Sequence, residues 1–302
     1  MTAQKTKPTV GVIGLGIMGS SISSNLQQTG FEVYGVELNA ATRKKMKPLL
    51  THVDADAKDL LLYTSKIISS LPSTQALMQV CQTLCESKKH HKIKGTPILV
   101  EASTFPLKDK QQAKDMLLES GIHMIDAPLS GTGAQAKTKD LSIYASGKAS
   151  DVKAFDAIFN GFARSHYFVG EFGNGMKMKL VANLLVAIHN VSTAEAILFG
   201  QQLGLESKSL VNIIGSGAGS SRMFQVRGPM MTSRTWKQAT MKNDVWQKDM
   251  SIIYEALNDM KLPAPLFTAC IPIYHAAMSQ GHQLHDTASV YAVLEKMAGV
   301  DR

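Results

Sequence analysis

Cysteine is scarce in this chain of 302 residues, with only Cys81, Cys85 and Cys270 present. Three cysteines cannot build the disulfide framework that stabilises small secreted proteins. No histidine or cysteine pair near Cys81 and Cys85 completes a zinc-binding set, so we expect no metal site. We therefore expect reduced, buried thiols in a cytoplasmic protein.

Long apolar runs and dense charge are also lacking. No uninterrupted apolar stretch reaches the roughly 18 residues of a membrane span. Charged residues are 19% of the chain and hydrophobic residues 44%, which indicates a buried core and not disorder. The net charge is +8, but the densest basic runs, residues 43–47 and 88–94, are not interleaved with aromatic residues. We therefore expect neither nucleic acid nor a membrane as a partner.

The first half of the sequence alternates short β-rich runs with longer helical patterns, which is typical of a parallel, doubly wound sheet. Strands are predicted at residues 9–13, 31–36, 67–70, 98–100 and 123–125, and helices at 17–29, 39–47, 75–85 and 108–119. From about residue 173 the pattern is helical almost throughout. The predicted division is an N-terminal tail at 1–7, a Rossmann-type domain at 8–172, and an all-α domain at 173–302 that begins with a long helix at about 175–203.

The first predicted strand leads directly into the sequence Gly14-Leu15-Gly16-Ile17-Met18-Gly19. A Gly-x-Gly-x-x-Gly spacing between a strand and a helix is the dinucleotide-binding fingerprint. The first glycine permits a tight turn, the second lets the backbone approach the pyrophosphate, and the third lets helix and strand pack closely. The N–H groups at the start of the helix then face the phosphates. We therefore expect all six residues to contact the cofactor.

An acidic residue follows the second predicted strand. Glu37 lies eighteen residues after the last glycine of the fingerprint, where a carboxylate can accept hydrogen bonds from the ribose hydroxyls of NAD and repel the 2′-phosphate of NADP. The next two residues, Leu38 and Asn39, include no arginine, although Arg43 and Lys44 are near. We expect Glu37, Leu38 and Asn39 to contact the cofactor, with NAD preferred and NADP possible.

Further motifs follow in order along the chain. They are Leu71-Pro72, Glu101-Ala102-Ser103-Thr104-Phe105-Pro106, Asp126-Ala127-Pro128-Leu129-Ser130-Gly131-Thr132, Gly173-x-Gly175-x-x-x-Lys179-x-x-x-Asn183, and Lys248-Asp249. Together with the glycine fingerprint they resemble the motifs of the β-hydroxyacid dehydrogenase family, over about residues 9–294. That family includes 3-hydroxyisobutyrate dehydrogenase, tartronate semialdehyde reductase, L-threonate dehydrogenase and 6-phosphogluconate dehydrogenase. The resemblance implies an α/β Rossmann-type N-terminal domain, a long interdomain helix and an all-α C-terminal domain.

The resemblance also implies roles for individual residues. The lysine that matches Lys179 transfers the proton in the family, and the asparagine that matches Asn183 helps to hold the substrate. The family's substrate signature, Asp-Ala-Pro-Val-Ser-Gly-Gly, implies substrate contacts for Ser130, Gly131 and Thr132, although Thr132 stands where the family has a second glycine. Cofactor contacts are implied for Leu71, Pro72, Thr104 and Lys248.

The expected function is that of an NAD(P)-dependent oxidoreductase that moves a hydride between nicotinamide and a small β-hydroxy acid or its semialdehyde. Lys179 would accept the hydroxyl proton in oxidation and return it in reduction. The resemblance further implies a homodimer or homotetramer formed through the all-α domain. Two alternatives stay open: a reductase of imines or other small carbonyl compounds, and a non-catalytic NAD(P)-binding scaffold protein. Imine reductases typically lack the lysine that Lys179 matches, and some relatives act as scaffolds after losing it.

Overall fold

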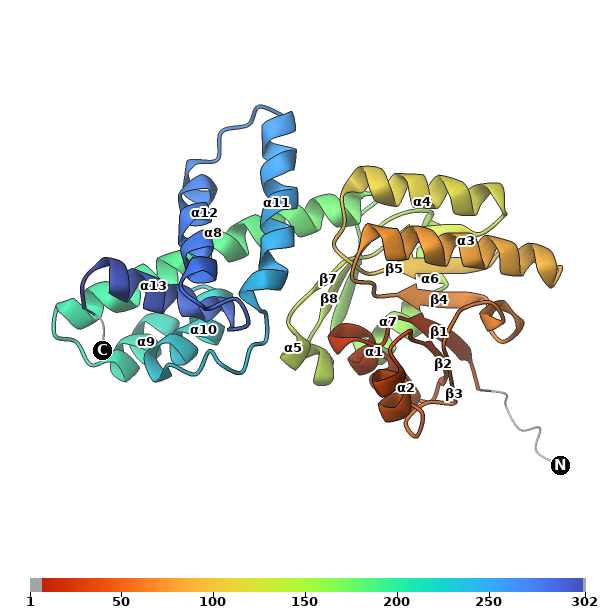
Figure 1. The fold of residues 1–302 in the computed structure, drawn as a ribbon, viewed down its shortest axis with the longest axis horizontal. Coiled ribbons are helices and arrows are strands. Elements are labelled where there is room, and N and C mark those ends of the chain that lie inside the picture. Colours follow the sequence, from red (N-terminus) through yellow and green to blue (C-terminus); the bar gives the residue numbers. More distant parts are fainter. Residues whose placement is uncertain (1–6, 301–302) are drawn as a thin grey trace. The chain divides into compact units, whose positions relative to one another are not determined.

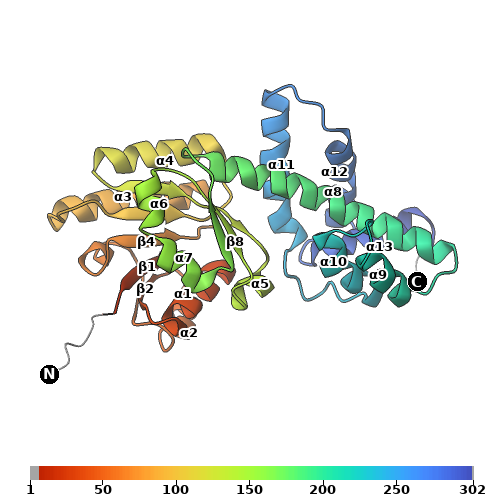
Figure 2. The ribbon, with the colours of Figure 1, turned by 180° about the vertical axis from the view of Figure 1, so that it is seen from behind.

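A computed structural model describes residues 7–300 of the chain. These residues form two compact units, and the boundary falls between Lys179 and Leu180. In Figures 1 and 2 the colours run from red to green through the first unit and from green to blue through the second. The first unit combines strands with helices and the second is helical, which confirms the predicted fold class.

A six-stranded sheet forms the centre of the first unit. Its strands lie in the order β3-β2-β1-β4-β5-β6, and all neighbouring strands are parallel. They are β1 (Thr9–Ile13), β2 (Glu32–Val36), β3 (His52–Asp54), β4 (Lys66–Ser69), β5 (Ile98–Glu101) and β6 (His123–Asp126). The strand order reverses between β1 and β4. In doubly wound sheets, ligands bind at such a switch point, outside the carboxyl ends of the strands.

Helices cover both faces of this sheet (Figures 1 and 2). They are α1 (Ile17–Gln28), α2 (Ala40–Met46), α3 (Thr74–His90), α4 (Leu107–Glu119), α6 (Ala149–Lys153) and α7 (Asp156–Phe162). Because successive strand residues point to opposite faces, Ile68 packs into a core with α1 and α7, whereas Ile67 packs into a second core with α3 and α4. Burial on both faces explains why these strands are continuous apolar runs.

A second sheet of three strands follows β6 and lies outside the sequence-based expectation. Its strands, in the order β7-β8-β9, are β7 (Leu129–Ser130), β8 (Ser142–Ala145) and β9 (Ser165–Phe168), and α5 (Gly133–Lys137) connects the first two. Each has only two to four residues, and none is a run of buried apolar residues such as the one in β5. Tyr167 and Phe168 of β9 are exposed, so the aromatic residues of this strand do not mark a buried face.

Helices surrounding an apolar core make up the second unit. They are the C-terminal part of α8 (Asn174–Gln202), then α9 (Ser207–Gly215), α10 (Arg222–Ser233), α11 (Asn243–Asp259), α12 (Pro265–Ser279) and α13 (Val290–Met297). The buried aromatic side chains of Trp246, Phe267, Tyr274 and Tyr291 contribute much of this core. The core therefore depends on packing between helices that are distant in sequence.

Helix α8 is long and apolar enough to cross a membrane by length and composition alone, with 39% of its most apolar window buried. The core helix of a water-soluble protein passes the same test. Polar groups on α8 are indeed used inside the second unit: the Asn190 Nδ2 group donates to the Thr287 carbonyl at 2.9 Å and to Tyr274 Oη at 3.1 Å. These buried hydrogen bonds fit a core helix, because a lipid-facing position offers an amide no such partners.

A buried ion pair fixes the chain around α10 and the segment before α11. Arg227 Nε lies 3.1 Å from Asp286 Oδ1, and the two side chains are 2% and 0% exposed. The other carboxylate oxygen accepts the N–H groups of Thr240 at 2.8 Å and Met241 at 3.0 Å. Burial alone would raise the pKa of Asp286, but Arg227, the N–H groups of Ala288 and Met241 and the Thr240 hydroxyl outweigh it and hold that pKa below its ordinary value.

Replacing the cation of this pair should destabilise the protein strongly. In Arg227→Met the Asp286 carboxylate stays buried without its counter-charge, so we expect the free energy of unfolding at neutral pH to fall by about 3–5 kcal/mol. Urea unfolding followed by circular dichroism measures this change. The exposed Lys208→Met serves as the control for loss of one positive charge. A loss no larger than that of the control would contradict the assignment.

The same pair predicts a pH dependence. A carboxyl whose folded-state pKa is lowered stabilises the protein above its unfolded-state pKa, and this stabilisation is lost as the pH falls through the folded-state value. The wild type should therefore lose stability below about pH 4, the ordinary range of an aspartate. Arg227→Met should lose less stability over the same acid range, because without Arg227 the pKa of Asp286 is no longer lowered in the folded state.

Candidate functional site

The glycine-rich loop lies at the switch point of the sheet, between β1 and α1. Gly14 has a φ of +86°, and a Cβ atom there would lie 2.2 Å from the backbone oxygen of Ser70, which follows β4. A Cβ atom at Gly19 would lie 1.8 Å from the Gly14 oxygen. At Gly16, in contrast, no described atom lies within 4 Å of such a Cβ. Two of the glycines are thus required by packing, whereas the middle one faces open space.

A carboxylate stands beside this loop at the carboxyl end of β2. Glu37 Oε2 accepts the Leu15 N–H at 2.8 Å, and Oε1 accepts the Asn39 N–H at 2.9 Å. The Arg43 guanidinium donates to the carbonyls of Glu37 at 2.8 Å and Leu38 at 2.6 Å. The sequence showed Arg43 only as a nearby residue, and the structure brings its charged group to the same corner.

The segments after β4 and β5 are tied to one another. The Leu71 N–H donates to Ser103 Oγ at 2.8 Å, and the Ser103 N–H donates to Glu101 Oε1 at 2.9 Å. Pro72 and Thr104 adjoin these two bonded residues in the chain. Because β4 and β5 are parallel neighbours, both segments lie at the same edge of the sheet as the glycine-rich loop.

The residues expected to hold substrate lie where β7 leads into α5. Gly131 has a φ of +136°, and Thr132 is the N-cap of α5. The Thr132 N–H donates to Gln135 Oε1 at 3.0 Å, and Thr132 Oγ1 accepts the Gln135 N–H at 3.5 Å. The Gln135 side chain is held in turn by Asp140, with Nε2 donating to Oδ2 at 2.9 Å. The polar groups of Thr132 therefore stabilise the loop itself, whereas Ser130 precedes this capping box.

This loop lies against the glycine-rich loop. A Cβ atom at Gly133 would approach Ile17 Cγ2 to 2.5 Å, and Asn25 Nδ2 on α1 donates to the Ala136 carbonyl on α5 at 2.8 Å. The first unit thus brings together the sequence-predicted cofactor residues of α1 and the sequence-predicted substrate loop.

Lys179 lies on α8, whose first turn is anchored to β6 and β8. The Met176 N–H donates to Asp126 Oδ2 at 2.7 Å, and the Gly175 N–H donates to Ser146 Oγ at 2.9 Å. A Cβ atom at Gly175 would lie 2.2 Å from the Tyr144 oxygen, so only glycine allows this approach. The Lys179 side chain follows one turn later and is 8% exposed. A buried lysine near a fixed helix start is a candidate for proton transfer.

Asn183 and Lys248 belong to the second unit and share one partner. Asn183, which is 5% exposed, donates from Nδ2 to Asp249 Oδ2 at 2.8 Å. Lys248 Nζ lies 3.3 Å from Asp249 Oδ1. The sequence places Asp249 only within the Lys248-Asp249 motif. The signal that it matters was its position directly after a motif lysine on the buried face of α11.

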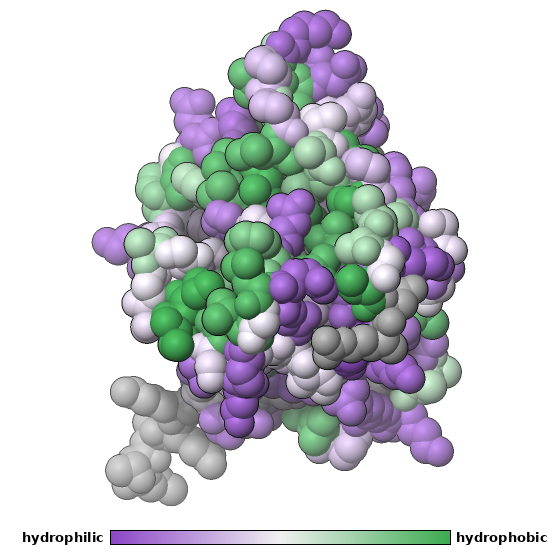
Figure 3. Space-filling view, turned by 90° about the vertical axis from the view of Figure 1, so that its left-hand side faces the viewer, coloured by the Kyte–Doolittle hydropathy of each residue, from purple (hydrophilic) through white to green (hydrophobic). Residues whose placement is uncertain are grey.

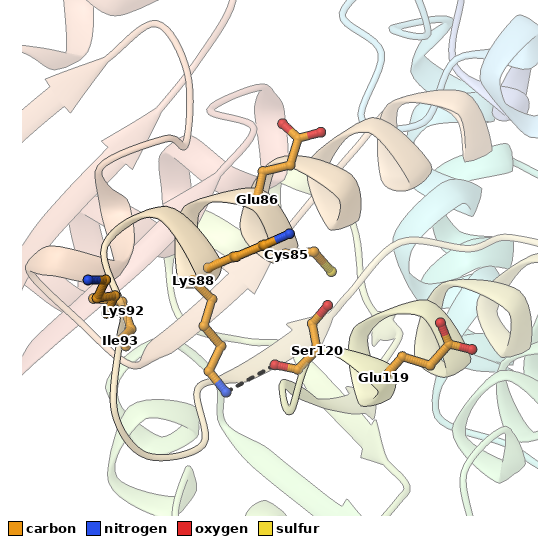
Figure 4. Close-up of a pocket in the computed structure, with 8 residues that line it drawn as sticks. Cys85, Glu86, Lys88, Lys92, Ile93, Glu119 and Ser120 are labelled. Atoms are coloured by element: carbon orange, nitrogen blue, oxygen red, sulfur yellow. Dashed lines mark hydrogen bonds between the residues drawn. The ribbon is translucent and has the colours of Figure 1, made fainter.

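The hollow drawn in Figure 4 is a different feature. Its lining residues, from the C-terminal ends of α3 and α4, are Cys85, Glu86, Lys88, Lys89, Lys92, Ile93, Glu119 and Ser120. Lys88 Nζ donates to the carbonyls of Ser120 at 3.0 Å and Gly121 at 2.8 Å. A lysine at a helix C-terminus stabilises the unpaired carbonyls there. Since none of the described motif residues lines this hollow, we assign its lysine a structural role.

Comparisons with known proteins agree with these motifs. Residues 9–170 match the family model described as the NAD binding domain of 6-phosphogluconate dehydrogenase. Residues 173–294 match the model described as NAD-binding of NADP-dependent 3-hydroxyisobutyrate dehydrogenase. The first model alone spans more than half of the chain.

Similar proteins cover nearly the whole chain. L-threonate dehydrogenase of Cupriavidus necator is 24% identical over 94% of this chain and 95% of its own length. Mitochondrial 3-hydroxyisobutyrate dehydrogenase of Rattus norvegicus is 27% identical over 96% of this chain and 88% of its own length. The solved structure of Mycobacterium tuberculosis 3-hydroxyisobutyrate dehydrogenase with L-serine is 21% identical, has a TM-score of 0.84, and covers 95% of this chain and 99% of its own. With its motifs in the family's order and both family models matched, the chain belongs to the NAD(P)-dependent β-hydroxyacid dehydrogenase family.

Proposed function

We propose that this protein oxidises a small β-hydroxy acid with NAD, or reduces the corresponding semialdehyde, and that Lys179 transfers the proton. The burial of the Lys179 side chain, 8% exposed and one turn from the anchored start of α8, carries this proposal. Imine reductases and non-catalytic scaffold proteins are expected to lack this lysine. No feature of the described residues favours either alternative.

The glycine-rich loop fits the pyrophosphate of a dinucleotide. The first N–H groups of a helix have no acceptor within the helix itself. In α1 the N-cap is Gly16, which supplies no side-chain acceptor, and the described first turn contains no acidic residue. The open space in front of Gly16 leaves room for a phosphate to reach these N–H groups. We propose cofactor contacts at Gly14, Leu15, Gly16, Ile17, Met18, Gly19, Glu37, Leu38, Asn39, Leu71, Pro72, Thr104 and Lys248.

The environment of Glu37 supports a preference for NAD over NADP. Each oxygen of this carboxylate accepts one backbone N–H and keeps further lone pairs for the ribose hydroxyls. A 2′-phosphate would be repelled by the same charge. Arg43 lies at this corner, but its Nη1 is bonded to the carbonyls of Glu37 and Leu38, so it is held by the backbone. NADP stays the second choice.

The proton chemistry belongs to residues of α8. The nicotinamide supplies hydride acceptance and donation when it is bound. In the oxidation direction Lys179 Nζ accepts the hydroxyl proton, and in reduction it returns a proton to the substrate oxygen. Asn183 is oriented by Asp249, which takes its Nδ2 group. The Oδ1 end of the amide then serves as the acceptor for a substrate hydroxyl.

The loop between β7 and α5 and the names of the relatives support the proposed substrate class. We propose that Ser130 and Gly131 bind the substrate carboxylate and that Thr132 shapes the loop through its bonds with Gln135. Relatives of this chain are named for L-threonate and 3-hydroxyisobutyrate, both small hydroxy acids. An acid of this size, with its hydroxyl near the carboxylate, is the substrate that we propose.

We further propose a cytoplasmic homodimer or homotetramer, in which residues 8–172 bind the cofactor and residues 173–302 form the subunit interface. Large apolar side chains are exposed in the helical part of the chain, among them Phe199, Leu203, Leu205 and Ile213. Figure 3, which looks at the side where α9 and α13 lie, shows apolar patches on that face. Apolar patches of this kind favour association, and the three free cysteines suit a reducing compartment.

A panel of substrates tests the proposed reaction. NAD and NADP are paired with short hydroxy acids, and NADH and NADPH with the matching semialdehydes, while the absorbance of the reduced nicotinamide is followed. We expect turnover of at least one compound and a fall in kcat of about 10²–10⁴-fold in Lys179→Met. The exposed neighbour Lys177, which bonds to Asn174, supplies the control Lys177→Met. Near-normal turnover in Lys179→Met would refute the role of this lysine.

Cofactor choice should depend on the charge of Glu37. In Glu37→Gln the amide oxygen can still accept one backbone N–H, but the negative charge that repels a 2′-phosphate is gone. We expect the wild type to bind NADH more tightly than NADPH by about tenfold or more, and the variant to bring the two dissociation constants near parity. Isothermal calorimetry with both cofactors measures the ratio. A ratio that does not change would show that Glu37 has no part in the discrimination.

Substitutions of two glycines in the loop should affect cofactor binding and thermal stability differently. Gly16→Ala places its methyl group in open space, so we expect an unchanged thermal midpoint and a rise of about tenfold or more in the dissociation constant of NADH. Gly19→Ala collides with the Gly14 oxygen and should lower the thermal midpoint as well. Calorimetry and thermal unfolding together give both quantities. Unchanged NADH binding by Gly16→Ala would contradict the assignment of this loop.

A further inference from the structure

A lysine with no exposed surface lies between two buried carboxylates in the first unit. Lys110 on α4 places its Nζ atom 2.8 Å from Glu101 Oε2 at the end of β5 and 2.7 Å from Asp126 Oδ1 at the end of β6. All three side chains are 0% exposed. None of the cofactor or proton-transfer roles proposed above involves Lys110.

The charge of this lysine is held in place by its neighbours. Burial by itself would lower the pKa of Lys110, but Glu101 and Asp126 outweigh that effect and raise the pKa above its ordinary value. The ammonium therefore stays charged at neutral pH. Buried charge clusters of this kind are a poor source of stability, because desolvation offsets most of the Coulomb attraction. Their value lies in the geometry that they impose on the groups around them.

One arm of the cluster leads to the segments proposed to contact the cofactor. Glu101 binds Lys110 through Oε2 and accepts the Ser103 N–H through Oε1. Ser103 Oγ accepts the Leu71 N–H at 2.8 Å. The position of Lys110 thus sets the segment after β5, which includes Thr104, and through it the segment after β4.

The other arm leads to the helix of Lys179. Asp126 binds Lys110 through Oδ1 and accepts the Met176 N–H through Oδ2. The same Oδ2 accepts a hydrogen bond from Ser146 Oγ at 3.0 Å. Ser146 Oγ in turn accepts the N–H groups of Gly173 and Gly175. The first turn of α8 is therefore held by the carboxylate that Lys110 orients.

We propose that Lys110 is a positioning residue, which holds the segments after β4 and β5 and the first turn of α8 in one fixed arrangement through Glu101 and Asp126. Its effect on turnover rests on the proposed function of Lys179, whereas its effect on cofactor binding does not. A displacement of about 1 Å in a reacting group can lower a rate by about 10²-fold. A single rigid link between the two segments and α8 therefore has consequences for both binding and rate.

Two conservative variants separate the arms. An amide has one acceptor atom where a carboxylate has two. The side chain introduced by Glu101→Gln must therefore give up either Lys110 or Ser103, and that of Asp126→Asn must give up either Lys110 or the α8 and Ser146 donors. Lys110→Met removes the link itself and exposes the carboxylates to each other, so the two conservative variants keep the proposal testable if this variant does not fold.

The measurements are the dissociation constant of NADH by calorimetry, kcat with saturating NADH, and amide hydrogen exchange at residues 176–179. Glu101→Gln should raise the NADH dissociation constant by about tenfold and leave kcat within about threefold. Asp126→Asn should leave NADH binding within about threefold, lower kcat by about 10²-fold and speed exchange at residues 176–179. Lys110→Met should raise the NADH dissociation constant, lower kcat and speed amide exchange at residues 176–179.

The matched control is a second contact between side chains, at the other end of β6. His123 Nδ1 lies 2.6 Å from Asp151 Oδ2 on α6, away from the segments that Lys110 links. His123→Ala should lower thermal stability, but it should not change the NADH dissociation constant and kcat independently of one another. The proposal is overturned if Lys110→Met leaves both quantities within about twofold, or if Glu101→Gln and Asp126→Asn change binding, rate and exchange in the same proportion as this control.

The outcomes distinguish this proposal from the proposed function. If Lys179→Met retains turnover, the role of Lys179 fails, but NADH binding and amide exchange still test the two arms. If Lys179→Met loses turnover while the arms show no split, the function stands and the link through Lys110 is refuted.

Discussion

The capture of the Met176 N–H by the buried Asp126 carboxylate anchors the first turn of α8. The orientation of the buried Lys179, which follows one turn later in the same unit, depends on this start. A free N–H at a helix terminus attracts a negative charge, and the approach of the glycine at position 175 to β8 brings the terminus close enough to meet one. Gly175 and Asp126 therefore anchor the start of α8 together, although they lie about fifty positions apart in the chain.

Much of the fold could be predicted from the sequence because the parallel sheet is buried on both faces. Strands such as Ile98–Glu101 are short apolar runs between helical patterns. Asparagine is a favoured N-cap residue, and in the structure the Asn39 side chain accepts the Thr42 N–H at the start of α2. The second sheet could not be predicted, because its strands are partly exposed and contain no continuous buried apolar run. Local pattern carries no information about strands whose pairing is set by distant segments.

The candidate site also has one part that could be predicted from the sequence and one part that could not. The glycine fingerprint has a local mechanism, so its position at the switch point of the sheet follows from the sequence. The partners that orient the motif residues do not. Asp249 turns the Asn183 amide, and Lys110 joins Glu101 to Asp126, through contacts that arise only when separate elements pack. A buried lysine on α4 resembles an ordinary surface residue in the sequence, because neighbouring helix positions are charged as well.

The capping box at Thr132 bears on how recognition is achieved. Where the family has a flexible glycine, this chain has a residue whose N–H and hydroxyl are both bonded to Gln135, which is itself bonded to Asp140. A loop that is already ordered loses little conformational entropy when a ligand arrives. It also adapts poorly to a ligand of another shape. For the substrate-binding role proposed above, the order of the loop between β7 and α5 predicts selection by fit to a fixed shape and not by closure around the ligand.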